Sequence, residues 1–178
     1  TAVTRAGSLA LVANGYGGVQ VFGIAELANP YKVGVIKPAG FARDVAVRDG
    51  FAFIAASHEG LVVADTDDPS LPMVAVLDLF GVANRIAIEG DRAFITEMGG
   101  DDETSQLSIV DISDPYAPQV DRTLLLHPGQ VNLRPEGAYD VHVRGGKAFV
   151  TVQYVDQEGR PARGLVEVVD LVVHGKHH

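Results

Sequence analysis

The stretch "RDVAVRDGFAFIAASHEGLVVADTDDPSLPMVAVLDLFG" (residues 43–81) decides the fold, because the chain repeats it. Clear copies are "NRIAIEGDRAFITEMGGDDETSQLSIVDISDPYAPQVDRTLLL" (84–126) and "YDVHVRGGKAFVTVQYVDQEGRPARGLVEVVDL" (139–171), and a more divergent copy opens the chain at 5–40. A repeat of about 40–45 residues is typical of an architecture in which similar units stack on one another.

Each copy contains four short runs that we interpret as strands. In the copy at 43–81 they are "DVAV", "FAFIAA", "GLVVAD" and "MVAVLDL", which are rich in Val, Ile and Phe and are separated by Gly, Asp and Pro. The turn "RDG" between the first two suits a tight hairpin. The turn "DTDDPSLP" between the last two offers Asp side chains that cap their own backbone and prolines that fix φ. No segment has a convincing helical period, so we predict essentially no helix.

Four antiparallel strands per repeat is typical of a β-propeller blade, and one blade cannot cover both of its own faces. We therefore predict an all-β protein, a β-propeller of four-stranded antiparallel blades with about four repeats. The predicted blades and the His-rich tail lie at residues 1–40, 41–81, 82–135, 136–173 and 174–178. After Asp170 the last copy shows neither a "DPxxP" turn nor a fourth strand. This favours a partial ring of a larger propeller; the alternatives are a closed small propeller and a half-ring completed by another chain.

Composition excludes several classes of function. The net charge of −9 argues against a nucleic-acid partner, because binding to phosphates needs a basic face. No apolar run approaches the roughly 18 residues that cross a bilayer. The chain has no Cys, which excludes disulfides, thiolate nucleophiles and zinc–thiolate sites. No secretion signal is visible and the first residue is Thr1, so we expect a processed or excised N-terminus.

The segment "LSIVDISDPYAP" (107–118) resembles the LVIVD-repeat β-propeller family of bacterial and archaeal exported or cell-surface proteins, and "GLVVADTDDPSLP" (60–72) is a weaker match. "RDVAVRDGFAFIA" (43–55) fits the same repeat. The resemblance implies a propeller and an extracellular, cell-surface or periplasmic location, but it says little about activity. The first copy departs from the pattern, since Gly23 stands where the other copies have Asp.

The order of the strands predicts which loops share a face of the propeller. Loops that follow the second and fourth strands lie on one face, and all of the length variation falls there, after Thr96, Leu126 and Val152. Insertions in repeat proteins tend to gather on the binding face, although neutral drift also lengthens loops. We predict that this loop face binds the partner. The candidate residues are His58, Glu97, Asp101, Asp102, Glu103, His127, Arg134, Tyr139, Asp140 and His142.

Some of these candidates suggest metal binding or catalysis. The acidic run that begins at Glu97 offers ligands for a hard cation such as Ca²⁺, but it lacks the "DxDxDG" spacing and a solvated loop is favoured. His142 stands where the other copies have Ala46 and Ala87. We expect it to point into the central channel or its mouth beside Asp140, as a base, a metal ligand or a hydrogen-bonded residue in a wet channel.

Two further groups of residues complete the analysis. The tail residues His174, His177 and His178 can bind Ni²⁺, Cu²⁺ or Zn²⁺, and a tag remnant or a disordered end is the favoured alternative. Charged residues at the start of the first strands, Arg43, Asp44 and Arg85, are predicted to form an ion-pair ring around the channel. No cofactor is predicted, and a divalent metal ion is the one candidate.

The favoured function is a non-catalytic interaction scaffold, exported or at the cell surface, that presents the loop face to a protein or a glycan. The chain has no "GxSxG" motif and no phosphate-binding loop. The first alternative is a propeller enzyme with a channel site, either a metal-dependent hydrolase or lactonase or a quinoprotein-like oxidoreductase. The second is a structural partner of an extracellular redox protein that donates His to a metal or haem. Further blades or another chain would complete the ring.

Overall fold

The computed structural model describes residues 2–99, 105–126 and 134–171, and within these ranges all regular structure is β-strand. The first sheet contains β1 (Ala2–Ala6), β2 (Leu9–Ala13), β3 (Val19–Gly23) and β4 (Tyr31–Ile36). The second contains β5 (Asp44–Arg48), β6 (Phe51–Ala55), β7 (Leu61–Asp65) and β8 (Met73–Leu77). The third contains β9 (Val82–Glu89), β10 (Arg92–Met98), β11 (Ser105–Asp111) and β12 (Gln119–Leu126). The fourth contains β13 (Arg134–Arg144), β14 (Lys147–Val155) and β15 (Pro161–Asp170).

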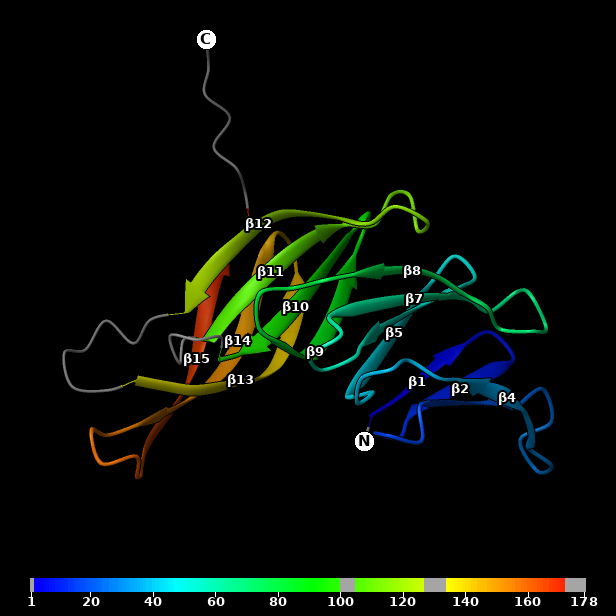
Figure 1. Cartoon of the computed structure of the whole chain (residues 1–178), viewed down its shortest axis with the longest axis horizontal. Helices are drawn as coiled ribbons and strands as arrows, with labels where there is room; N and C mark the ends of the chain where they lie inside the picture. The colour runs from blue at the N-terminus through cyan, green and yellow to red at the C-terminus, as the bar shows by residue number, and fades with distance from the viewer. Residues whose placement is uncertain (1, 100–104, 127–133, 172–178) are drawn as a thin grey trace, which may run out of the picture.

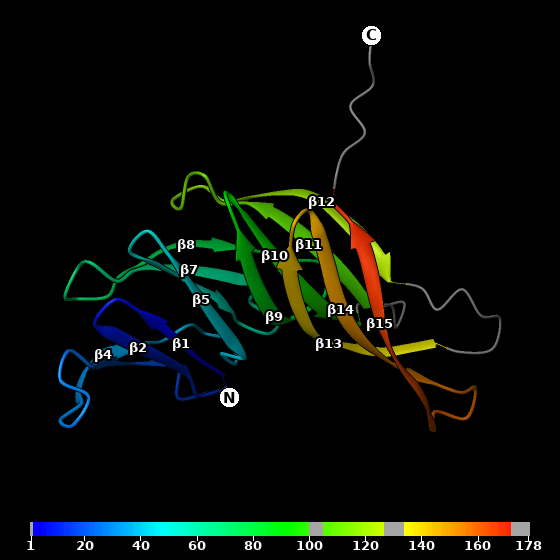
Figure 2. The same ribbon diagram turned by 180° about the vertical axis from the view of Figure 1, so that it is seen from behind.

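Every sheet is antiparallel and follows the order of the chain, as expected for propeller blades (Figure 1). The first strands of successive sheets contact each other in the order β1, β5, β9 and β13. The sheets form an arc that is not closed into a ring, and the first and last blades lie at its two ends (Figure 2). The predicted all-β propeller fold is thereby confirmed. No helix in the described ranges is long and apolar enough to cross a membrane.

The hydrophobic core lies between blades rather than within them. We call the side of a blade that is turned toward the next blade its trailing face, and the side turned toward the previous blade its leading face. Leu11 and Val21 on the trailing face of the first blade pack with Ile54 and Val62 on the leading face of the second. Because an inner strand is covered on both sides, β7 is buried at four successive positions. This explains why its sequence alternates so weakly.

The Asp residues repeated at the ends of the third strands hold the turns that connect third and fourth strands. The Oδ1 atom of Asp65 accepts hydrogen bonds from the backbone N–H groups of Asp67 (2.9 Å) and Asp68 (3.1 Å). Asp111 accepts in the same way from Ser113 at 2.9 Å, and this contact lowers the pKa of the Asp111 carboxyl. The most regular part of the repeat therefore serves the architecture.

Candidate functional site: the loop face and the last blade

Backbone hydrogen bonds join the turn after the second strand to the connection between blades on one side of the first two blades, which we call the loop face. Residues 100–104 and 127–133, which carry the predicted insertions after Thr96 and Leu126, lie outside the described residues. Gly15, in the turn between β2 and β3, exchanges two backbone hydrogen bonds with Ala42, which lies just before β5. One blade later, Ser57 in the turn between β6 and β7 accepts from the N–H of Ala83 at 3.0 Å. In the first two blades the turn after the second strand is thus fastened to the segment that leads into the next blade.

Aromatic side chains are exposed on this loop face. Tyr16 is 86% exposed and meets Phe41 edge to face, with ring centroids 5.0 Å apart. The guanidinium carbon of Arg43 lies 5.5 Å from the centroid of the Phe41 ring. Tyr16, Phe41 and Arg43 form what we call the aromatic patch. Phe80, 68% exposed, occupies the corresponding connection one blade later.

Sequence reasoning assigned Arg43 to an ion-pair ring and missed Tyr16 and Phe41, because these two residues lie outside the regular strands and do not recur in every copy. The available signal was an aromatic residue beside glycine in a turn, as in "NGYGG" and "AGFAR". An aromatic side chain in a short polar turn has little of the protein interior to pack against, so it is a candidate for a contact surface.

Two glutamates, one half-buried and one fully buried, accept hydrogen bonds from the backbone of the connections between blades. The Oε2 atom of Glu59 accepts from the N–H of Gly40 at 2.6 Å, and that of Glu97 accepts from the N–H of Gly81 at 2.6 Å. Glu97 is fully buried and also accepts from Nε2 of Gln106 at 3.0 Å. Its position differs from the exposed acidic loop that we expected, since its strand carries the side chain inward to cap the connection between blades.

The other predicted residues are distributed as follows. His58 is exposed in the turn between β6 and β7, on the loop face. Arg134 begins β13. In the described part of the chain no three His, Cys, Asp or Glu side chains come together as metal ligands. Outside the described residues lie Asp101, Asp102, Glu103, His127, His174, His177 and His178.

His142 lies on the trailing face of the last blade. In the register of the sheets it pairs with Phe149, as Ala46 pairs with Phe53 and Ala87 with Phe94. Ala46 and Ala87 pack against the cores between blades. The position of His142 differs from the channel position that we expected, because alternation along β13 turns it toward the side of the blade.

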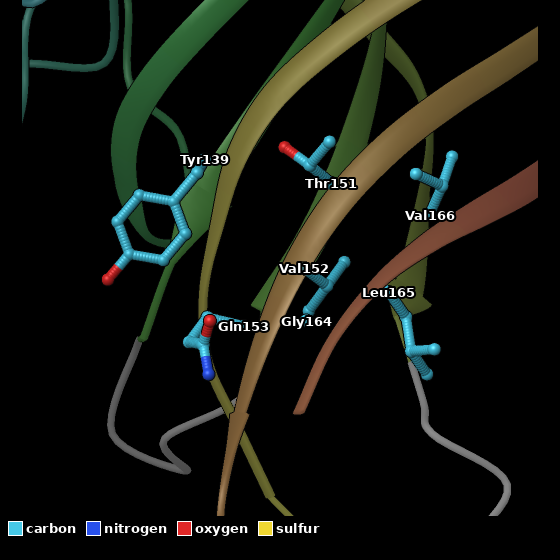
Figure 3. A pocket seen from close by; sticks show the side chains of 7 residues that line it. All are labelled: Tyr139, Thr151, Val152, Gln153, Gly164, Leu165 and Val166. Atoms are coloured by element: carbon cyan, nitrogen blue, oxygen red, sulfur yellow. The ribbon is translucent and has the colours of Figure 1, made fainter. Parts of the chain in front are cut away.

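Asp140 is two residues away on the same face, where its Oδ1 atom accepts from the N–H of Val141 at 2.9 Å. Tyr139 is 46% exposed. Nearby, β13, β14 and β15 enclose an open hollow of about 390 Å³ (Figure 3). The hollow is lined by Tyr139, Thr151, Val152, Gln153, Gly164, Leu165 and Val166.

Asp44, the counterpart of Asp140, connects two blades. Its carboxylate accepts from the N–H of Val45 at 2.8 Å and from the N–H of Ile86 in the next blade at 3.1 Å. Burial raises the pKa of Asp44, whereas these hydrogen bonds and the nearby Arg85 act in the opposite direction. The expected ion-pair ring is replaced by contacts to the backbone, since Arg85 donates to the carbonyl of Asn84 at 3.1 Å.

Two of the repeats match a known family. Residues 39–76 and 80–122 match the LVIVD repeat. The chain contains LVIVD repeats. The matched segments are the second and third blades, in which the turn-capping Asp residues were found.

Solved structures show the same fold at low sequence identity. The LVIVD-repeat protein is similar to the computationally designed Ika4 protein, with 12% identity and a TM-score of 0.64 over 97% of this chain and 91% of that one. It also resembles the dihydro-heme d1 dehydrogenase NirN, with 14% identity and a TM-score of 0.61 over 95% of this chain and 39% of that one. AztD from Citrobacter koseri matches with 11% identity and a TM-score of 0.56 over 93% of this chain and 46% of that one.

These likenesses concern the fold alone. The LVIVD-repeat protein spans less than half the length of NirN and of AztD. No curated protein matches it significantly in sequence.

Proposed function

We propose that this LVIVD-repeat protein is a non-catalytic interaction scaffold, exported or at the cell surface, whose loop face binds a protein or a glycan. The observation that carries the proposal is the aromatic patch. The few residues that dominate binding energy in protein interfaces are enriched in Tyr, Trp and Arg, and ring faces offer a rigid apolar surface that ligands can cover.

The patch is held in place before any partner arrives. Gly15 and Ala42 tie together the two segments that carry Tyr16 and Phe41, and Glu59 fixes Gly40 beside Phe41. A Cβ atom on Gly40 would lie 2.0 Å from the carbonyl oxygen of Ala56, so only glycine permits this close approach. A surface that is already ordered loses less entropy when it binds.

Arg43 adds a positive charge to a surface of an otherwise acidic chain. Its guanidinium carbon lies 5.5 Å from the centroid of the Phe41 ring, so the charge sits beside the exposed aromatic residues. A partner that carries a carboxylate would complement this guanidinium, because charge-assisted hydrogen bonds are stronger than neutral ones. Acidic glycans and acidic loops of proteins both meet that requirement.

The enzyme alternative has less support from the placement of its candidate residues. It requires His142, Asp140 and Glu97 to converge on one channel site. Glu97 is buried and engaged beneath the loop face in the third blade, whereas Asp140 and His142 lie on the trailing face of the fourth. The scaffold is therefore the function that we carry forward.

The proposal is tested by removing the two rings of the aromatic patch. Purified wild-type protein and a Tyr16→Ala/Phe41→Ala variant are applied to a glycan array and to intact bacterial cells. We expect binding to weaken by at least about tenfold, as for the loss of hot-spot side chains.

Tyr116→Ala serves as the matched control. Tyr116 is 59% exposed and contacts Phe51 edge to face at 5.6 Å, but it lies in a turn between third and fourth strands, on the opposite face. The control variant should bind like the wild type. Equal losses in the two variants, unchanged binding by the patch variant, or no binding by the wild type would each contradict the proposal.

A further inference from the structure

The trailing face of the fourth blade has the chemistry of an interface between blades but is not covered by one. Four equivalent positions, two on each of the second and third strands, form the centre of every trailing face. In the first three blades these twelve residues are between 0% and 3% exposed: Leu11, Ala13, Val19 and Val21; Phe53, Ala55, Leu61 and Val63; Phe94, Thr96, Leu107 and Ile109.

The fourth set preserves the pattern but not the burial. By register it consists of Phe149, Thr151, Val166 and Val168. Phe149 is 38% exposed, Val166 is 58% exposed and Val168 is 57% exposed. An aromatic residue and two valines are exposed to solvent at positions that are buried in the other blades. Such an apolar surface indicates a contact with another sheet.

The leading face of the first blade is the other uncovered face. Its equivalent positions are Ala10, Val12, Gln20 and Phe22, all partly exposed, and beside them Val3 is 71% exposed. The second strand of every copy carries an alanine on its leading face. Ala52, Ala93 and Ala148 each share a core with the large residue of the preceding blade, which is Leu11, Phe53 and Phe94 respectively. Ala10 is the equivalent alanine of the first blade.

The two uncovered faces also match in their hydrogen-bonding groups. Asp44 reaches from the trailing face of the second blade to the N–H of Ile86 in the third. Asp140 is the residue equivalent to Asp44, and Val3 is the residue equivalent to Ile86, since they occupy the same register positions. In the first blade itself the residue before Val3 is Ala2, which has no carboxylate that could accept a hydrogen bond from the N–H of Val3. Asp140 can therefore supply to Val3 the contact that Asp44 supplies to Ile86.

We propose that the trailing face of the fourth blade binds the leading face of the first blade of a second copy of this chain. Within one copy these two faces lie at opposite ends of the arc (Figures 1 and 2). The contact is head to tail, so each copy uses one face of each kind, and two copies are the fewest that cover every exposed face in a closed ring. This inference is independent of the proposed function, which concerns the loop face.

Sedimentation velocity of the full chain over a range of concentrations tests the proposal. We expect the wild-type protein to form a dimer or a longer head-to-tail assembly. Val168→Glu and Val3→Glu each place a charge at an exposed position in the proposed contact. Each variant should therefore fold, but on its own it should be unable to make the head-to-tail contact and should remain a monomer. A monomer at all concentrations would overturn the proposal, whether or not that monomer closes its own ring.

Mixing the two variants identifies the partner face. Val168→Glu keeps an intact leading face and Val3→Glu keeps an intact trailing face, so their mixture should form a one-to-one heterodimer. Val76→Glu is the matched control, because Val76 is 55% exposed on β8 of the second blade, and it should associate like the wild type. Failure of the mixture to associate, or loss of association in the control, would overturn the head-to-tail contact.

Discussion

Replacing Phe53 with alanine will destabilise the protein by about 3–5 kcal/mol, the range for removal of a buried aromatic ring. Phe53 is 2% exposed and packs in the core between the second and third blades. The loss combines the transfer of the ring into water with a cavity that rigid sheets cannot close. Urea unfolding monitored by circular dichroism measures the change in the free energy of unfolding.

Phe149→Ala is the matched control for that experiment. Phe149 is the same residue type at the same register position two blades later, but it is 38% exposed. At protein concentrations below those that allow association, its replacement should cost less than half as much as that of Phe53. Equal costs would mean that the fourth blade is covered by the chain itself, contrary to the open arc.

Replacing Glu97 with alanine will destabilise the protein by about 2–4 kcal/mol, because two buried donors lose their acceptor. These donors are the N–H of Gly81 and the side-chain amide of Gln106. Thermal unfolding of the variant by calorimetry gives the change. Glu97→Gln retains one acceptor oxygen and should recover most of the lost stability.

Glu59→Ala provides a comparison at the equivalent connection. Glu59 accepts from Gly40 as Glu97 does from Gly81, but its side chain is only partly buried, so water can replace it and the cost should be smaller. A Glu97→Gln variant as unstable as Glu97→Ala would show that the negative charge, rather than the acceptor, is what the site requires.

The fold was predictable from the sequence because each copy repeats one pattern with its own turn chemistry. The bounds of the strands follow from the Val- and Ile-rich runs, and Asp65 and Asp111 mark the ends of β7 and β11. Gly23 in the divergent first copy still ends β3, because packing between blades fixes the strand even where the motif has changed.

The candidate site was less predictable, because side-chain direction depends on how blades stack. The alignment correctly paired His142 with Ala46 and Ala87, but only the sheet shows that this position faces the side of a blade. In the sequence Glu97 belongs to an acidic run that resembles a loop. In the structure it lies in β10, where the pairing with β9 shifts by one residue between Thr96 and Glu97, and no local pattern reports that shift. The aromatic patch arises from two loops far apart in the chain, a proximity that no local pattern reports.

Amide hydrogen exchange of the second strands β6, β10 and β14, at concentrations that keep the chain monomeric, tests the central claim most directly. That claim is that burial between blades holds the fold and that the last trailing face is open. Each of these strands pairs with a neighbour on both edges, so a difference among them reports how well the faces of the blade are covered. The account predicts slow exchange in β6 and β10, which are buried on both faces, and much faster exchange in β14, whose trailing face is exposed, because protection follows local stability. Protection of β14 equal to that of β6 would contradict it.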